Sequence, residues 1–303
     1  MTGPPAVAGA APVSPARAER YRWRPVELGA YALALGAFLV LFAKPAQLLA
    51  RDWWKDPDAG HGLLLFPVAL WLAWRGGIRP DARANPWLGS LVLVGSVLLR
   101  LASELAAELF TMRLSMLGAV AGLVVFFLGF RQLLHWWLPV VLLGLAIPLP
   151  ELVRSGLALP LQFKASALGA ALLEWRHVPI RLSGNIIQLP GHQLFVTEAC
   201  SGLRSLTALL SLGFLMGGLW LQRPVSRALL VLGTVPIAVF INGVRVFVTG
   251  FLVFYVDPAM GEGFMHVTEG WLLFLVSLLL IGLAAGIFRL GERWLATRQA
   301  THA

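Results

Sequence analysis

The sequence has little charge for its length. Charged residues make up 13% of its 303 residues, hydrophobic residues make up 58%, and the mean hydropathy is +0.77. A soluble globular domain is typically ~45–50% apolar and ~25% charged, and disordered chains carry more charge still. The composition excludes both classes and predicts a polytopic membrane protein.

Cysteine is almost absent, and histidine is scarce. Cys200 is the one cysteine, so the chain cannot form an internal disulfide or a zinc-binding cysteine cluster. Four of the six histidines lack metal-ligand spacing and are expected in loops or at the interface. We therefore expect neither a metal nor an organic cofactor. These histidines are His135, His177, His192 and His302.

Acidic residues are outnumbered, 15 against 24 basic ones, for a formal net charge of +9. In a soluble protein this balance would favour nucleic acid as a partner. Here the basic residues stand in short loops beside hydrophobic stretches, where the positive-inside rule accounts for them. We expect the lipid bilayer as a partner and no nucleic acid.

Long hydrophobic runs recur along the chain. A bilayer core of ~30 Å takes ~20 mostly apolar helical residues, and about eight stretches approach that length. Backbone groups in lipid must be satisfied internally, so we expect an all-α, polytopic transmembrane helix bundle. The expected spans are 26–43, 61–77, 86–103, 113–130, 134–150, 203–221, 228–250 and 267–288.

Arginines are concentrated in every second loop between these spans. Placing the arginine-rich N-terminal tail in the cytoplasm puts the other arginine-rich loops there too, so both termini are expected to be cytoplasmic. We expect a disordered cytoplasmic tail over 1–24, an integral membrane domain over 25–290 and a cytoplasmic tail over 291–303. The loop arginines are Arg75, Arg79, Arg83, Arg131, Arg223 and Arg227.

Residues 151–200 are expected to form a loop on the outer face. Within it, 156–175 is expected to be an interfacial or re-entrant helix, because a crossing would move every later loop to the opposite side. Ser183-Gly184-Asn185 and Pro190-Gly191 are turn signals. They predict a short hairpin-like excursion that leads directly to Cys200.

The segment TEACSGLRSL places Cys200 where this loop meets the span 203–221. A thiol at a helix N-terminus faces the positive end of the helix dipole, which favours the thiolate. Arg204 and Glu198 flank it and are candidate supporting residues. These surroundings suit a nucleophilic cysteine, although a lone membrane cysteine is also typical of a small buried hydrophobic residue.

Arg245 is a charged residue inside the apolar span 228–250. Even the mildest insertion scale assigns such a residue a cost of ~2.5–3.5 kcal/mol, so it needs a role. Asn242 and Thr249 share its helix face, which predicts an inward-facing polar stripe. The alternative is an arginine that reaches the outer headgroups.

His266 stands at the outer start of the last expected span, where Glu269 could orient its imidazole. An ordinary interfacial histidine is the alternative. The orientation puts Cys200, Arg245 and His266 at one depth, as nucleophile, oxyanion stabiliser and proton carrier for acyl transfer. His61 lies in the outer loop DPDAGHG. It is expected either to border an outer cavity shared with Cys200, Arg245 and His266 or to stand in a plain turn.

Four segments together resemble a known family. WWKDPDAGHGLLLFPVALWLAWR, TEACSGLRSL, FINGVRVFVTG and HVTEGW resemble the exosortase/archaeosortase family of membrane transpeptidases, over about residues 50 to 270. The resemblance implies that Cys200, Arg245 and His266 are catalytic, with histidine at the third place as in bacterial members. The early block departs from the family's usual Tyr-Ser-His-Gly, because Ala59-Gly60 precede His61 here.

The resemblance implies a cysteine-dependent transpeptidase of the bacterial inner membrane, with its active site facing the periplasm. Its expected partners are membrane-anchored proteins with a C-terminal Pro-Glu-Pro (PEP-CTERM) sorting signal and an unidentified envelope acceptor. A thioacyl enzyme would form on Cys200, with Arg245 at the oxyanion, Asn242 orienting Arg245, and His266 transferring protons.

Two other functions fit the same residues. A transporter or scaffold for an envelope polysaccharide would use Arg245 and Asn242 as a polar site, and Cys200 would be dispensable. A purely hydrolytic intramembrane protease would need the same residues but would release a free carboxylate. The second nucleophile is not part of the chain, so transfer and hydrolysis both stay open.

Overall fold

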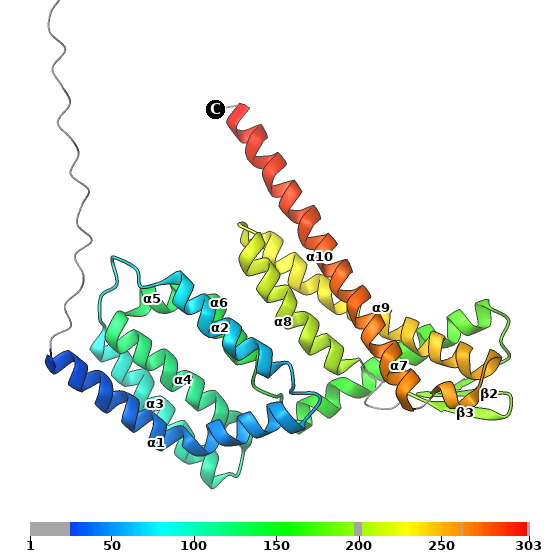
Figure 1. Cartoon of the computed structure of the whole chain (residues 1–303), viewed down its shortest axis with the longest axis horizontal. Coiled ribbons are helices and arrows are strands. Elements are labelled where there is room, and N and C mark those ends of the chain that lie inside the picture. Colours follow the sequence, from blue (N-terminus) through cyan, green and yellow to red (C-terminus); the bar gives the residue numbers. More distant parts are fainter. Residues whose placement is uncertain (1–24, 197–201, 262, 302–303) are drawn as a thin grey trace, which may run out of the picture. The chain divides into compact units, whose positions relative to one another are not determined.

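The computed structural model describes residues 25–196, 202–261 and 263–301 (Figure 1). The chain divides into two compact units, Met1–Leu41 and Phe42–Ala303, and the long first helix α1 (Pro25–Lys55) contains the boundary. All contacts described below lie within Phe42–Ala303.

Seven helices in the described residues are long and apolar enough to cross a membrane: α1, α3, α4, α7, α8, α9 and α10. This confirms the expected all-α, multi-pass membrane bundle. The remaining helices are shorter. The elements after α1 are α2 (Gly62–Gly76), α3 (Pro86–Leu105), α4 (Leu109–Leu128), α5 (Phe130–His135), α6 (Trp137–Leu145), α7 (Glu151–Trp175), β1 (Arg181–Ser183), β2 (Ile186–Leu189), β3 (His192–Phe195), α8 (Leu203–Trp220), α9 (Pro224–Tyr255), the 3-10 turn η2 (Pro258–Gly261) and α10 (Gly263–Thr301).

The expected continuous span 134–150 is wrong. The helix breaks at Trp136, and the nine residues of α6 rise only about 14 Å. Helices α5 and α6 together lie antiparallel to α2. Helix α2 is also short, with 15 residues. A ring nitrogen of His61 lies 3.1 Å from the Leu145 carbonyl oxygen at one end, and a ring nitrogen of His135 lies 3.0 Å from the Gly76 carbonyl oxygen at the other. The two stretches therefore connect the same two ends of the bundle.

The arginine-rich loops gather at one of these ends. The backbone N–H of Arg79 donates to the Gln132 side chain at 2.9 Å, and the Arg227 guanidinium lies over the Trp137 ring. Glu292 accepts hydrogen bonds from the backbone N–H groups of Gln222 and Arg223. The loops that the positive-inside rule assigned to one side of the membrane thus share one end of the structure, and their cytoplasmic location stays a prediction.

Helix α7 differs from the expected loop, because 151–175 is one helix of 25 residues that qualifies as a span by length and composition. It packs on α9 through glycines: a β-carbon at Gly169 would lie 2.5 Å from Val246, and Gly243 and Gly250 contact Leu168 and Leu173. Gly243, Val246 and Gly250 follow Asn242 along α9, and Asn242 is the residue that contacts Gly202 at the start of α8. The interfacial placement of 156–175 stays a prediction.

The expected hairpin-like excursion is a three-stranded antiparallel sheet in the order β1-β2-β3. Gly184 and Gly191 occupy its two turns with φ of +64° and +78°, a region that glycine adopts without strain. Pro190 and Gly191 are the two central residues of the second turn. The turn signals in the sequence therefore predicted both reversals.

Close packing of α3 on α4 gives a testable prediction. A β-carbon at Gly89 would overlap the backbone of Phe126, whereas a β-carbon at Gly95 in the same helix would meet nothing within 4 Å. We expect Gly89→Ala to force the helices apart and destabilise the protein by about 1–3 kcal/mol. Thermal unfolding of the purified protein should show a clear fall in midpoint for Gly89→Ala and none for Gly95→Ala. Equal midpoints for the two variants would contradict the packing.

Candidate functional site

The polar stripe of α9 is an interior face of the bundle. Asn242 and Thr249 are buried, at 6% and 2% exposure, and Arg245 between them is half buried. The Thr249 hydroxyl donates to the Arg245 carbonyl oxygen at 3.0 Å. The polar groups thus lie where α9 contacts its neighbours, as the helical spacing predicted.

Asn242 lies against the first residue described after Cys200. A β-carbon at Gly202 would lie 2.7 Å from Cγ of Asn242, and Gly202 has φ of +79°. Only glycine fits both the close approach and the backbone conformation without strain. Gly202, the residue before α8, is therefore held against the polar face of α9.

Arg245 lies against the helix that carries His266. A β-carbon at Gly270 would lie 3.1 Å from Nη2 of Arg245, and Gly270 follows His266 by one helical turn of α10. The polar face of α9 thus touches two elements, one beginning just after Cys200 and the other containing His266. That Cys200 and His266 themselves meet Arg245 stays a prediction.

Some expected site residues fall outside the description. Cys200 and Glu198 lie outside the described residues. His266 and Glu269 are described as backbone within α10 only. Their side-chain roles stay predictions.

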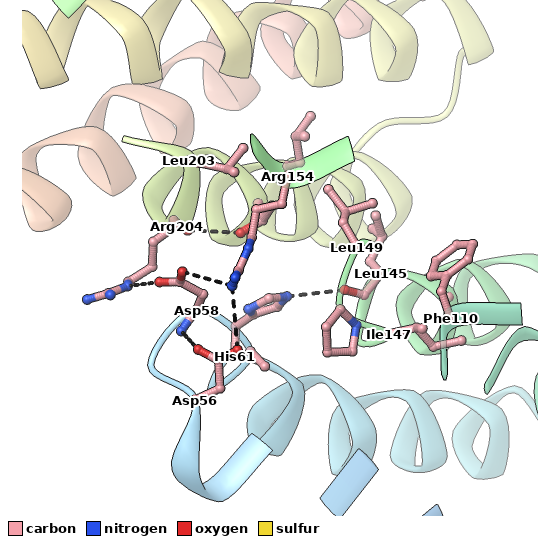
Figure 2. Close-up of a pocket in the computed structure, with 15 residues that line it drawn as sticks. Asp56, Asp58, His61, Phe110, Leu145, Ile147, Leu149, Arg154, Leu203 and Arg204 are labelled. Atoms are coloured by element: carbon pink, nitrogen blue, oxygen red, sulfur yellow. Dashed lines mark hydrogen bonds and ion pairs between the residues drawn. The ribbon is translucent and has the colours of Figure 1, made fainter. Parts of the chain in front are cut away.

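A second cluster of charges, which the sequence did not reveal, joins distant segments (Figure 2). Nε of Arg204 donates to a carboxylate oxygen of Asp58 at 2.6 Å. Arg154, at the start of α7, lies 3.4 Å from Asp58 and 3.8 Å from Asp56, and it also pairs with Glu151. No sequence pattern links Asp58 to Arg204, which lies 146 positions later. The one signal in the sequence was that the loop containing Asp58 was expected on the same side of the membrane as Cys200.

The acidic loop is itself fixed to the end of α6. The Trp53 indole N–H donates to the Ala146 carbonyl oxygen at 2.7 Å, and Gly62 leaves room for the Trp53 ring. Because the Leu145 carbonyl can only accept, Nε2 of His61 is the donor in their 3.1 Å contact. These bonds hold Asp58 where it meets Arg204.

A cavity of about 240 Å³ opens beside this cluster. Most of its wall is apolar, and the charged residues of the cluster line the rest. His61 lines it. A cavity that His61 shares with Cys200, Arg245 and His266 stays a prediction. The residues shown in Figure 2 include Asp56, Asp58, His61, Phe110, Leu145, Ile147, Leu149, Arg154, Leu203 and Arg204.

In the described part of the chain, no group of three or more histidine, aspartate or glutamate residues could hold a metal ion.

A family model decides the relationship. The model for the transmembrane exosortases matches residues 53–283, more than half of the chain. The chain belongs to the transmembrane exosortase family. Neither a curated protein nor a solved structure gave a significant match.

The exosortase match covers every contact of the candidate site. It begins at Trp53 and includes Asp58 and Arg204, the polar face of α9, and Gly270. The contacts of the candidate site therefore lie inside the family region.

The contact between Gly202 and Asn242 can be tested against a matched glycine. Gly191 also has a positive φ, of +78°, but a β-carbon there would meet nothing within 4 Å. Both Gly202→Ala and Gly191→Ala carry the backbone strain of about 1–2 kcal/mol, and only Gly202→Ala adds a clash. We expect a distinctly lower thermal midpoint for Gly202→Ala, partly restored when Asn242→Ala removes the clashing atoms. Equal midpoints for the two glycine variants, or no restoration, would contradict the contact.

Proposed function

We propose that this exosortase is a cysteine-dependent transpeptidase or peptidase. It cleaves membrane-anchored proteins near a C-terminal Pro-Glu-Pro sorting signal through a thioacyl intermediate on Cys200. The reaction takes place at the outer face of the bacterial inner membrane, towards the periplasm. The product is passed to an envelope acceptor or to water.

One observation carries the proposal. The polar face of α9 contacts Gly202, two residues after Cys200, and Gly270, one turn after His266. A half-buried guanidinium at this meeting point suits a reaction that develops negative charge, because a charge in a low-dielectric site interacts strongly. A packing role alone would not require arginine and asparagine on this face.

The first half of the reaction forms the thioester. The Cys200 thiolate attacks the scissile carbonyl carbon, and the carbonyl oxygen becomes an oxyanion that Arg245 stabilises. When the tetrahedral intermediate collapses, the carbon–nitrogen bond breaks and the amine takes a proton from His266. The C-terminal fragment leaves, and the remaining substrate stays bound to the sulfur.

The second half releases the product. Neutral His266 now takes a proton from the incoming amine, hydroxyl or water, which attacks the thioester carbonyl. The carbon–sulfur bond breaks and the thiolate returns. An amine or hydroxyl acceptor gives transfer and water gives hydrolysis, so the chemical form of the new C-terminus distinguishes the two.

Asn242 and Asp58 are proposed positioning residues. Asn242 supports the Gly202 turn and with it the segment that carries Cys200. Asp58 holds Arg204 at the start of α8, beside a cavity with mostly apolar walls that can accept the substrate next to the scissile bond.

The nucleophile is tested in cells that co-express a tagged protein with a Pro-Glu-Pro tail. We expect Cys200→Ala and Cys200→Ser to abolish processing, followed by gel mobility and mass, while both variants accumulate in the membrane. Arg245→Lys and His266→Ala should lower the processing rate by at least about 100-fold, the usual scale for oxyanion and proton-transfer groups.

Matched controls are Arg176→Lys, which alters an exposed arginine after α7, and His177→Asn, which alters an exposed histidine with φ of 60°. Both should process normally. Normal processing by Cys200→Ala would sink the thiol mechanism and favour the transport or scaffold function.

The Asp58–Arg204 pair gives a separate prediction. Asp58→Asn removes the carboxylate that holds Arg204, and Arg204→Gln leaves Asp58 with Arg154 alone, so we expect each variant to slow processing about 3- to 30-fold. The double variant Asp58→Asn/Arg204→Gln should lose less than the two single losses combined. Asp81→Asn, which breaks a similarly exposed pair with Arg79, should have no effect. Additive losses in the double variant would rule out a direct coupling.

A further inference from the structure

Among the described residues, β3 is the last strand of the small sheet and pairs on one side only, which leaves its other edge open. The Val196 N–H donates to the Asn185 carbonyl oxygen at 2.9 Å, which fixes the alternation of the β2–β3 ladder. Leu194 and His192 therefore direct their backbone groups towards β2. Gln193 and Phe195 direct theirs away from the sheet, so β3 presents a row of N–H and C=O groups to its surroundings.

The sheet is held on the bundle by one face. Ile187, Leu189 and Val196 are buried in one hydrophobic cluster with Val246 of α9, and Figure 1 shows the strands beside this helix. The residues that form this edge are accessible, since Gln193 is exposed and Phe195 is 54% exposed. Open backbone groups cannot be satisfied in hydrocarbon, so this edge belongs in water or at the interface.

The open edge leads to the proposed catalytic residues. Cys200 follows Phe195 by five residues, a reach of at most about 18 Å. Val196, directly after β3, shares its cluster with Val246, the neighbour of Arg245. The strand therefore ends beside the helix that carries the polar stripe.

We propose that the open edge of β3 binds the substrate as an added strand, an extended polypeptide that hydrogen-bonds to the backbone of Gln193 and Phe195. This inference rests on the proposed function and names how its substrate is held. Strand addition recognises a polypeptide main chain with unblocked N–H groups on alternate residues, and it fixes the direction in which the chain passes Cys200. The ligand is thus an extended peptide rather than a lipid or a glycan.

The sheet supplies its own control. Leu182 on β1 directs its backbone outward at the opposite edge, because its neighbours pair with β2. Gln193→Pro and Leu182→Pro each remove one outward N–H and no ladder hydrogen bond. With purified enzyme and a synthetic peptide containing the Pro-Glu-Pro motif, we expect Gln193→Pro to raise KM about tenfold with kcat within twofold. Leu182→Pro should leave both within twofold.

A second measurement does not depend on any strand variant. Peptides N-methylated at one non-proline residue at a time are bound to the Cys200→Ala protein, and the Kd of each is measured by fluorescence anisotropy. We expect Kd to rise about tenfold at alternate residues and to change little at those between.

Equal effects at the two edges, or N-methylation effects without alternation, would overturn the strand-addition proposal. Processing of the peptide by Cys200→Ala would instead overturn the proposed function. The two failures are therefore distinguishable.

Discussion

The contact between the polar face of α9 and glycines of its neighbours is the constraint on which the site depends. Asparagine and arginine side chains in an apolar helix must be covered by protein, and Gly202 and Gly270 let the chain approach them closely. On another part of α9, Gly243 and Gly250 admit side chains of α7. One helix thus fixes the start of α8, the helix of His266, and α7.

Hydrogen bonds and an ion pair fix the acidic loop after α1. The loop after α1 is tied to α6 by Trp53 and His61 and to α8 by the Asp58–Arg204 pair. An exposed ion pair contributes little stability, about 0–1 kcal/mol. Its value here is geometric, because it sets where Arg204 points next to the cavity.

The sequence predicted what local pattern encodes. Three polar residues at helical spacing marked the interior face of α9, and two Gly-containing turns marked the sheet. It did not predict the break at Trp136, since an apolar run gives no sign that its helix will end early. Nor did it pair Asp58 with Arg204, because that contact depends on how helices pack. The sequence predicted a helix at 156–175, but not its start at Glu151 or its packing against Gly243 and Gly250.

The central claim is that Cys200 carries the substrate as a thioester, and one measurement addresses it directly. Wild-type protein is mixed with the tail-bearing substrate, quenched in acid within one turnover, digested and analysed by mass spectrometry. With one cysteine in the chain, the site of attachment is unambiguous. The account predicts a substrate fragment on the Cys200 peptide that neutral hydroxylamine removes. If substrate is processed while the Cys200 peptide stays unmodified at every quench time, the account is contradicted.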